Sequence, residues 1–174
     1  MKRLHLIAAA ALLGAPGCAP PGTPAPALPA AIPPLSGEQR TAFALRYIDA
    51  SEGTGAAVEP HKCVYAHYTG WLTDGTKFDS SRDPAPDGTP RPPIGFPQGA
   101  RHVIAGWDEG FVGMRVGGRR RLFIPYQLAY GESGRPPVIP ARSDLIFDVE
   151  LMALADPIGG QGCPPWEAVS RTAP

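Results

Sequence analysis

Alternation of apolar and polar residues predicts two long strands in this chain. Residues 63–72 are rich in aromatic and β-branched side chains, and Asp74-Gly75 follows them as a turn signal. Residues 144–151 alternate cleanly between polar and apolar positions, as in a strand that buries one face. One face of the first strand would carry Val64, Ala66 and Tyr68, and the other would carry Cys63, Tyr65 and His67.

Weaker strand signals lie before and between these segments. Residues 42–48 carry enough apolar positions for a first strand, and residues 77–81 resume an extended segment after the turn. Residues 119–124 predict another strand, which Pro125 ends. Phe96 marks a brief return of the chain to the sheet.

The other segments of the domain predict one short helix and two long ordered loops. Residues 103–112 place Phe111 four positions after Trp107, so both rings fall on one face of a helical run. Residues 83–93 and 131–140 are too rich in proline and glycine for regular structure. The whole pattern predicts an α+β domain in which a curved antiparallel sheet of about five strands wraps around one short helix.

Length and charge narrow the organisation further. The 174 residues allow one domain with appendages, predicted over residues 41–155, and the glycine- and proline-rich tail over 156–174 is expected to be irregular. Basic and acidic residues both total 16, so no global charge draws the chain to nucleic acid or to an anionic membrane. We therefore expect no nucleic-acid partner, and without a dimerisation helix we expect a monomer.

The first residues are similar to an export signal. Two basic residues precede an apolar run over residues 4–13, and small residues follow before Cys18. The run is too short for a transmembrane helix. Gly17-Cys18 resembles a bacterial lipoprotein signal, which predicts a signal peptide over residues 1–18 and a lipid on Cys18. Secretion after a nearby cut and an uncleaved leader are the alternatives.

A tether is predicted over residues 19–40. Its first part is almost wholly alanine, proline, glycine and threonine, which bury too little apolar surface to offset the entropy of ordering. Such a disordered spacer would hold a soluble domain away from a membrane surface, and a solvated tail without a role is the alternative. We therefore expect a domain on the periplasmic side of a bacterial envelope, anchored by lipid to the outer membrane, with secretion as the other possibility.

Two polar clusters suggest chemistry that the strand geometry disfavours. His61, Cys63 and His67 share one strand face, but His61 and His67 would lie about 20 Å apart at roughly 3.3 Å per residue, too far to share an ion. Residues 119–121 are three arginines that strand alternation divides between two faces, so we expect a solvated strand end and no nucleic-acid patch. No metal and no cofactor is predicted.

Seven motifs stand in the order found in FK506-binding peptidyl-prolyl cis-trans isomerases, and the chain resembles this family over roughly residues 41–155. Each motif alone is a weak signal, but seven in order across one domain are specific. They are His67-Tyr68-Thr69-Gly70, Asp74-Gly75, Phe78-Asp79-Ser80-Ser81-Arg82, Val103-Ile104-Ala105-Gly106-Trp107, Ala129-Tyr130-Gly131, Val138-Ile139-Pro140 and Leu145-Ile146-Phe147-Asp148-Val149-Glu150-Leu151.

The resemblance implies a proline-binding pocket with Trp107 as its floor. The implied lining is Tyr68, Phe78, Asp79, Phe96, Val103, Ile104, Trp107, Tyr130, Val138, Ile139 and Phe147. Asp79, Tyr130 and Phe147 are the implied catalytic residues. The Tyr130 hydroxyl and the Ile139 backbone N–H would donate hydrogen bonds to carbonyls of the bound peptide, and Asp79 would stand near the twisting amide. Whether Asp79 acts on the transition state or orients its loop stays open.

The residue pattern alone allows a plainer interpretation of the same positions. Trp107, Phe78 and Phe147 could be ordinary core residues, Asp79 a turn residue, and Tyr130 a tyrosine that caps a turn. Only the order of the motifs favours the pocket.

The chain departs from the family pattern near the expected pocket. The loop before Phe96 is several residues longer than in the smallest members, and the basic partner of Asp79 has no clear counterpart. Arg82 or Arg91 could take its place. Ile94 replaces an aromatic pocket residue, and His102 replaces an acidic residue whose backbone carbonyl contacts ligand.

The chemistry implied by the resemblance needs no covalent step. Rotation about an X–Pro bond must break amide resonance, at a barrier of about 18–20 kcal/mol. A dry aromatic cavity favours the twisted amide, because that form carries less separated charge. We expect an isomerase that acts on proline-containing segments of exported proteins and is inhibited by FK506- or rapamycin-type macrolides. The alternative is a chaperone or interaction module that binds such segments with little turnover.

Two cysteines remain if Cys18 carries a lipid. In an oxidising compartment Cys63 and Cys163 are predicted to form a disulfide, which would pin the tail across the outer face of the strand that holds Cys63. Two reduced thiols are the alternative.

Overall fold

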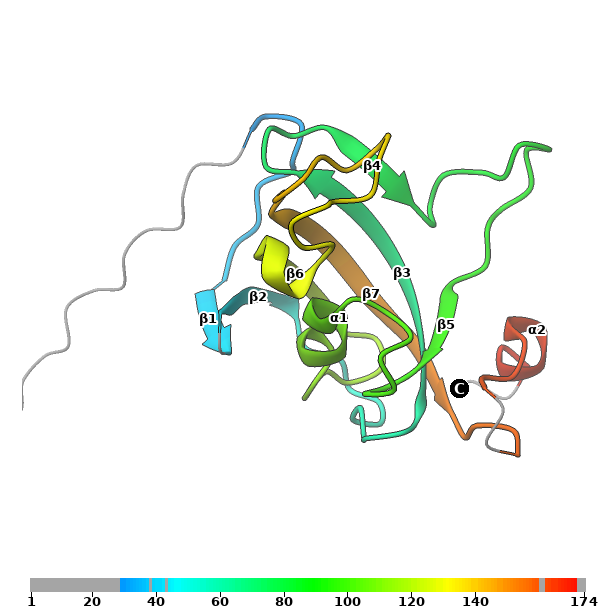
Figure 1. Cartoon of the computed structure of the whole chain (residues 1–174). Coiled ribbons are helices and arrows are strands. Elements are labelled where there is room, and N and C mark those ends of the chain that lie inside the picture. Colours follow the sequence, from blue (N-terminus) through cyan, green and yellow to red (C-terminus); the bar gives the residue numbers. More distant parts are fainter. Residues whose placement is uncertain (1–28, 38, 43, 160–161, 172–174) are drawn as a thin grey trace, which may run out of the picture.

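The computed structural model describes residues 29–37, 39–42, 44–159 and 162–171, and its centre is one curved antiparallel sheet (Figure 1). The strand order is β1-β2-β6-β7-β3-β4, and β5 pairs with β3. The strands are β1 Gln39–Ala42, β2 Leu45–Ser51, β3 Cys63–Leu72, β4 Lys77–Ser80, β5 Ile94–Pro97, β6 Arg119–Ile124 and β7 Leu145–Ala155. The predicted α+β class with a curved antiparallel sheet is confirmed.

Helices are few and short. The predicted helix is α1, Ala105–Gly110, and the turn after β6 is a 3₁₀-helix, Tyr126–Leu128. The tail, expected to be irregular, contains a second short helix, α2, Trp166–Val169. Within the described part of the chain, no helix is long and apolar enough to cross a membrane.

The two strands with the strongest sequence signals pair along the middle of the sheet. β3 and β7 align from Cys63 opposite Ala155 to Leu72 opposite Leu145, with one bulge after Tyr65. Figure 1 shows both as long curved ribbons that cross the molecule. Their inner faces carry much of the apolar core, including Val64, Ala66, Leu145, Phe147, Val149 and Leu151.

Helix α1 lies directly on the inner face of β6. A Cβ atom at Gly106 would come within 2.3 Å of Ile124 Cγ2, and one at Gly110 within 2.7 Å of Leu122 Cδ1. Only glycine therefore allows this close approach. The same packing buries Trp107, which is 4% exposed, at the base of the concave side of the sheet.

The outer face of the sheet is partly covered by the segment before β1. Ile32 is 4% exposed and packs with a cluster of outer-face residues: Ile48, Trp71, Phe123 and Ile146. The Pro33 carbonyl accepts a hydrogen bond from Arg121 at 2.7 Å. The packed unit thus begins before the predicted boundary at residue 41, and the end of the predicted tether belongs to it. Residues 1–28, with the predicted signal peptide and Cys18, lie outside the described residues.

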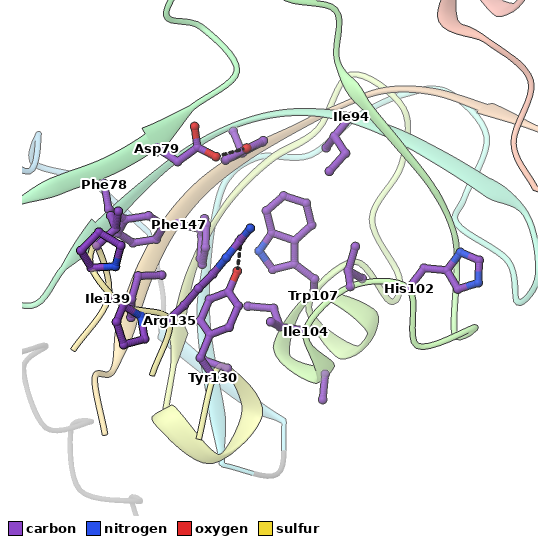
Figure 2. Close-up of a pocket in the computed structure, with 17 residues that line it drawn as sticks. Phe78, Asp79, Ile94, His102, Ile104, Trp107, Tyr130, Arg135, Ile139 and Phe147 are labelled. Carbon is purple, nitrogen blue, oxygen red and sulfur yellow. Dashed lines mark hydrogen bonds between the residues drawn. The ribbon is translucent and has the colours of Figure 1, made fainter. Parts of the chain in front are cut away.

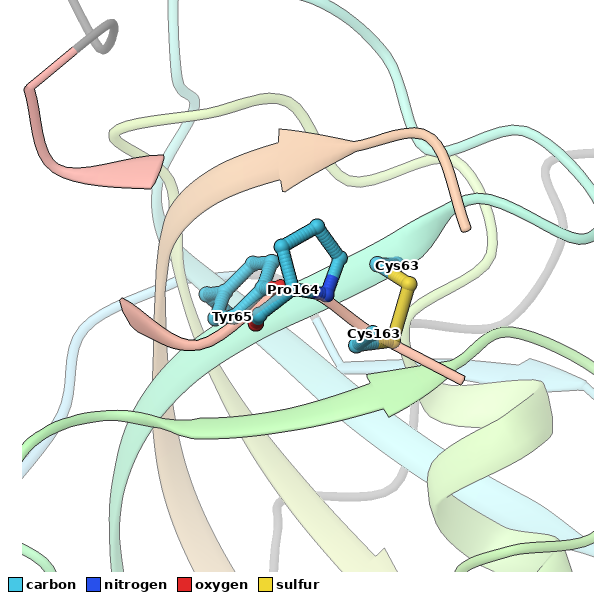
Figure 3. The surroundings of a disulfide bond; sticks show 4 residues. All are labelled: Cys63, Tyr65, Cys163 and Pro164. Carbon is cyan, nitrogen blue, oxygen red and sulfur yellow. Dashed lines mark hydrogen bonds between the residues drawn. A yellow bond between two sulfur atoms is a disulfide. The ribbon is translucent and has the colours of Figure 1, made fainter. Parts of the chain in front are cut away.

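The tail covers another part of the outer face (Figure 3). A disulfide joins Cys63 in β3 to Cys163, with Cα atoms 5.5 Å apart. The Tyr65 hydroxyl donates a hydrogen bond of 2.5 Å to the Pro164 carbonyl. Val169 is buried in the same cluster, and Trp166 packs against it. The tail is therefore held across the strand where the sequence placed it.

The prediction of a solvated arginine run is wrong for two of the three residues. Arg120 and Arg121 are only 6% and 1% exposed. Arg120 donates to Asp49 at 2.6 Å and to the Gly110 carbonyl at 2.8 Å. Arg121 donates to both carboxylate oxygens of Asp148, at 2.5 and 2.6 Å. Buried guanidinium groups need such partners, and strand alternation alone could not reveal them.

Candidate active site

A cavity of about 880 Å³ opens between the inner face of the sheet, α1 and the loop over residues 131–140 (Figure 2). Its volume is within the range of sites that hold small molecules. The lining residues come from nearly every part of the fold: Tyr68, Phe78, Asp79, Ile94, His102, Val103, Ile104, Ala105, Trp107, Ala129, Tyr130, Arg135, Pro136, Pro137, Val138, Ile139 and Phe147.

The structure brings together all but one of the predicted pocket residues. The exception is Phe96, which does not line the cavity but packs behind it, 5.7 Å from Trp107 and 5.4 Å from Phe111 between ring centres. Ile94 and His102, the two predicted departures, both line the cavity. The sequence interpretation missed the contribution of the loop, chiefly Arg135, Pro136 and Pro137, because glycine and proline in a loop carry no periodicity.

Aromatic rings form the floor and two walls of the cavity. The Trp107 indole lies at the base, with the Tyr68 ring 5.1 Å and the Phe147 ring 5.3 Å away in edge-to-face arrangements. Phe78 continues the wall, 5.5 Å from Phe147. Such edge-to-face contacts add to the stability of a buried aromatic cluster and fix the ring planes. The floor and these two walls of the cavity are therefore apolar and tightly packed.

One polar wall interrupts this apolar surface. Asp79 in β4 accepts a hydrogen bond from the Tyr68 hydroxyl at 2.5 Å and one from Arg91 at 3.2 Å. The same carboxylate accepts from the Ser80 backbone N–H at 2.8 Å. Arg91, in the long loop before β5, is thus the basic partner of Asp79, whereas Arg82 pairs with Glu150 on the other face.

This network sets the protonation of both cavity residues. Burial raises the pKa of Tyr68 to about 12, and the neighbouring Asp79 contributes in the same direction through its hydrogen bond and charge. Burial also acts to raise the pKa of Asp79, but hydrogen bonds from Tyr68 and Arg91 outweigh it and hold that pKa below its ordinary value. Tyr68 is therefore a protonated donor and Asp79 an ionised acceptor at neutral pH.

In the loop over residues 131–140, the Ile139 backbone N–H that was expected to bind a ligand is already occupied. The Ile139 backbone N–H donates to the Arg135 carbonyl at 3.0 Å, and the Arg135 N–H donates to the Ile139 carbonyl at 2.8 Å. Ile139 thus contributes its buried side chain, 3% exposed, and not its N–H. The residue order could not show that a tight turn consumes this N–H.

Three other donors at the cavity have no acceptor among the described residues. The Tyr130 hydroxyl accepts a long hydrogen bond of 3.5 Å from Arg135 and donates to no described residue. The Ile104 backbone N–H, directly before α1, also has no partner among the described residues, whereas the Ile104 carbonyl accepts from Trp107 at 2.9 Å. At the floor, the buried Trp107 Nε1–H has no acceptor in the described part of the chain. The site therefore offers donors to carbonyl oxygens of a ligand.

Among the described residues, no group of three or more histidine, cysteine or acidic side chains could hold an ion. His67, one of the residues considered for a metal, instead shares a hydrogen bond of 2.9 Å with Ser81. Burial lowers the His67 pKa, and the charge of Arg82 acts in the same direction.

Comparisons with known proteins agree with this geometry. A family model described as FKBP-type peptidyl-prolyl cis-trans isomerase matches residues 55–152. An FK506-binding protein of Neisseria meningitidis serogroup B is 48% identical over 104 residues, which cover 60% of this chain and 90% of that protein. FkpA of Aeromonas hydrophila, an FKBP-type peptidyl-prolyl cis-trans isomerase, is 46% identical over 121 residues, or 70% of this chain and 42% of FkpA.

Solved structures give the same result. The crystal structure of AtFKBP13 superposes with a TM-score of 0.60 at 35% identity, over 68% of this chain and 99% of that one. FkpA from Escherichia coli superposes with a TM-score of 0.58 at 37% identity, over 68% of this chain and 52% of FkpA. This chain thus spans about half the length of the FkpA proteins. From the family match and these relatives, the chain belongs to the FKBP-type peptidyl-prolyl cis-trans isomerases.

Proposed function

We propose that this chain accelerates cis–trans isomerisation of X–Pro bonds in proteins, and that the reaction takes place in the cavity above Trp107. One observation carries the proposal: the cavity combines aromatic walls with free hydrogen-bond donors. Membership of the isomerase family supports the same activity. The proline ring would rest on the Trp107 indole, with Phe78 and Phe147 at its sides.

The apolar walls favour the twisted amide. A planar amide has resonance-separated charge that water solvates well, and this solvation is lost inside the cavity. The twisted amide carries less of that charge, so it loses less solvation when it enters the cavity. Each difference of about 1.4 kcal/mol between the two states changes the rate about tenfold. Trp107, Tyr68 and Phe147 would therefore act by excluding water and not by bonding to the substrate.

Two donors would hold the flanking peptide while the bond turns. The Tyr130 hydroxyl and the Ile104 backbone N–H lie on the cavity wall and are free to donate to substrate carbonyls. A peptide held on both sides of the proline can rotate at only one bond, which lowers the entropic part of the barrier. In this proposal Ile104 takes the role that the family resemblance assigned to Ile139.

Asp79 would act mainly through its neighbours. Its oxygens already accept hydrogen bonds from Tyr68, Arg91 and Ser80, so the carboxylate holds the Tyr68 ring and the start of the long loop in place. Its proximity to the cavity also puts a fixed negative charge beside the twisting amide. We assign Asp79 a positioning role, and Tyr130 and Phe147 direct contact with substrate.

The substrates would be proline-containing segments of exported proteins, with FK506- or rapamycin-type macrolides as inhibitors that fill the same cavity. The disulfide between Cys63 and Cys163 supports an oxidising compartment outside the cytoplasm. We further propose that Cys18 carries a lipid that anchors the chain at the periplasmic side of an outer membrane. Mass spectrometry of the mature N-terminus tests this anchor, and an unmodified Cys18 would contradict it.

The decisive experiment is an isomerase assay on an X–Pro peptide without a coupling protease. Nuclear magnetic resonance exchange spectroscopy should show faster cis–trans exchange with catalytic amounts of residues 29–174, and a macrolide should abolish the increase. Phe147→Ala should remove most of the acceleration. Binding of the peptide without any acceleration would overturn the proposal and support an interaction module.

A further inference from the structure

The mouth of the cavity carries one basic side chain that has no acidic partner. Arg135 lines the cavity and is exposed, yet it forms no salt bridge with any described residue. Its guanidinium lies 5.8 Å from the centre of the Tyr130 ring and donates a hydrogen bond of 3.5 Å to that hydroxyl. Figure 2 shows the side chain reaching past the Tyr130 ring toward the oxygen. A charge of this kind is free to meet a ligand.

Nearby carboxylates are already engaged by other arginines. Asp79, across the cavity, is paired with Arg91. Glu132, in the same loop as Arg135, is paired with Arg142. The one other basic group on the lining is His102, which is exposed. The uncompensated charge at the mouth of the cavity is therefore positive and is located on Arg135.

The backbone presents this guanidinium from a fixed position. The Arg135 carbonyl accepts hydrogen bonds from the backbone N–H groups of Ile139 at 3.0 Å and Val138 at 3.2 Å. Gly134 precedes it with φ +64°, and a Cβ there would lie 2.2 Å from the Pro140 carbonyl oxygen. The turn is thus closed by hydrogen bonds and by a glycine that no other residue replaces without strain. The Arg135 backbone is therefore held in place, while its side chain is exposed.

We propose that Arg135 selects substrates with an acidic residue directly before the proline. This inference rests on the proposed isomerase function. If Tyr130 binds the carbonyl of the residue before proline, the side chain of that residue begins within two bonds of this carbonyl. A glutamate there reaches a guanidinium that lies 3.5 Å from the Tyr130 hydroxyl. Charge-assisted hydrogen bonds between arginine and carboxylate are stronger than neutral ones and supply the preference.

The expected preference is moderate. Arg135 is exposed, so water and salt screen the pair. Exposed ion pairs contribute up to about 1 kcal/mol, which corresponds to a preference of roughly threefold to fivefold in kcat/KM. Raising the salt concentration from about 0.05 to about 0.5 M should reduce this preference, because the screening length shortens severalfold.

Four peptides that differ only in the residue before proline test the proposal. Glutamate and glutamine have the same shape and differ in charge, while leucine and lysine give an apolar and a basic reference. Nuclear magnetic resonance exchange spectroscopy should give a kcat/KM for the glutamate peptide about threefold to fivefold above that for glutamine, with lysine lowest among the polar peptides. Equal values for glutamate and glutamine would overturn the proposal even if the leucine peptide is turned over.

Charge variants locate the effect. Arg135→Gln should bring the glutamate-to-glutamine ratio close to one, and Arg135→Glu should reverse the order so that lysine exceeds glutamate. Arg101→Glu makes the same change of net charge at an exposed arginine that does not line the cavity, and it should keep the wild-type ratio. An equal loss of preference in Arg101→Glu would show a long-range field and contradict the assignment to Arg135.

A binding measurement separates this proposal from the proposed function. Isothermal titration of the same peptides should rank glutamate above glutamine in the wild type and equalise them in Arg135→Gln. Activity on the leucine peptide without charge preference refutes Arg135 as a selector and leaves the isomerase function standing. No acceleration of any peptide refutes the isomerase function, and a glutamate preference in binding would then persist as a property of the cavity alone.

Discussion

The two faces of the central sheet bury their residues in different ways. The inner face carries the rings of Tyr68 and Phe147 and leaves a cavity of about 880 Å³ above Trp107. The outer face carries Phe123 and Ile146, and the segment before β1 closes over them with Ile32. The same strands therefore supply a large apolar site on one side and a partly covered surface on the other.

Polar groups are also divided between the faces. On the inner side, the Tyr68–Asp79–Arg91 network lies at the edge of the cavity and leaves the floor apolar. On the outer side, Arg121 is buried between Asp148 and the Pro33 carbonyl, and a disulfide ties down the tail. The disulfide and the buried Arg121 therefore hold the segments before β1 and after β7 on the face of the sheet that is turned away from the cavity.

The largest expected effect comes from replacing one phenylalanine on each face of the sheet with alanine. Phe147→Ala should lower the free energy of unfolding by about 3–5 kcal/mol and reduce kcat/KM at least tenfold, because it removes core contacts and one cavity wall. Phe123→Ala on the outer face should cost similar stability yet leave the activity of the folded protein within about twofold. Denaturant unfolding and the exchange assay measure both. Equal losses of activity would show that the faces are not independent.

The disulfide gives the next largest effect, and it should appear in stability alone. Opening the bond between Cys63 and Cys163, which are 100 positions apart, should lower the free energy of unfolding by about 2–4 kcal/mol. Urea unfolding of the wild type with and without reductant measures the loss, and the Cys63→Ala/Cys163→Ala variant should match the reduced form. Isomerase activity of the reduced protein should stay within about twofold. A collapse of activity would link the tail to the cavity.

Removing one hydrogen-bond donor from the cavity should have the opposite effect to opening the disulfide: activity should fall while stability is retained. Tyr130→Phe should lower kcat/KM about tenfold, since one hydrogen bond to the peptide is lost, while the free energy of unfolding changes by less than about 0.5 kcal/mol. Tyr126→Phe, one turn earlier and outside the cavity lining, is the matched control and should retain activity. If both variants behave alike, Tyr130 does not contact the substrate.

The smallest effect concerns the charge of Asp79. Because its pKa is held below the ordinary 3.8, ionised Asp79 stabilises the fold above that pH, and this contribution disappears as the pH falls through the lowered value. Its side chain is 44% exposed, so the contribution should stay under about 1 kcal/mol. Urea unfolding of wild type and Asp79→Asn should differ at pH 7 and converge in strong acid. A constant difference at all pH values would contradict this account.

The regular elements of the inner face were largely predictable. Residues 63–72 and the strand after Asp144 carry strong β patterns, and the Trp107–Phe111 spacing indicates a helix. These patterns reflect which side of each element meets the core, and that property is local to the element. Motif order then identified the aromatic floor and walls of the cavity, but it missed Arg135, Pro136 and Pro137 and placed Phe96 in the cavity instead of behind it.

Contacts between segments that are distant in the sequence were harder to predict. Neither the burial of Arg121 nor the choice of Arg91 over Arg82 as partner of Asp79 follows from local pattern, because each depends on how loops far apart in the chain meet. The Ile139 N–H is occupied by a hydrogen bond within a turn, and the residue types allow this turn without requiring it. Such features need the full set of neighbouring atoms.

The strands and the short helix follow from local patterns in the sequence, because hydrophobic periodicity and turn residues act within a few positions of the chain, and the order of the motifs indicates the family. Only the folded arrangement shows which N–H groups and which arginine face the cavity, and that the segment before β1 covers part of the outer face. Hydrogen bonds and desolvation depend on geometry at the scale of ångströms between segments, which no residue pattern specifies.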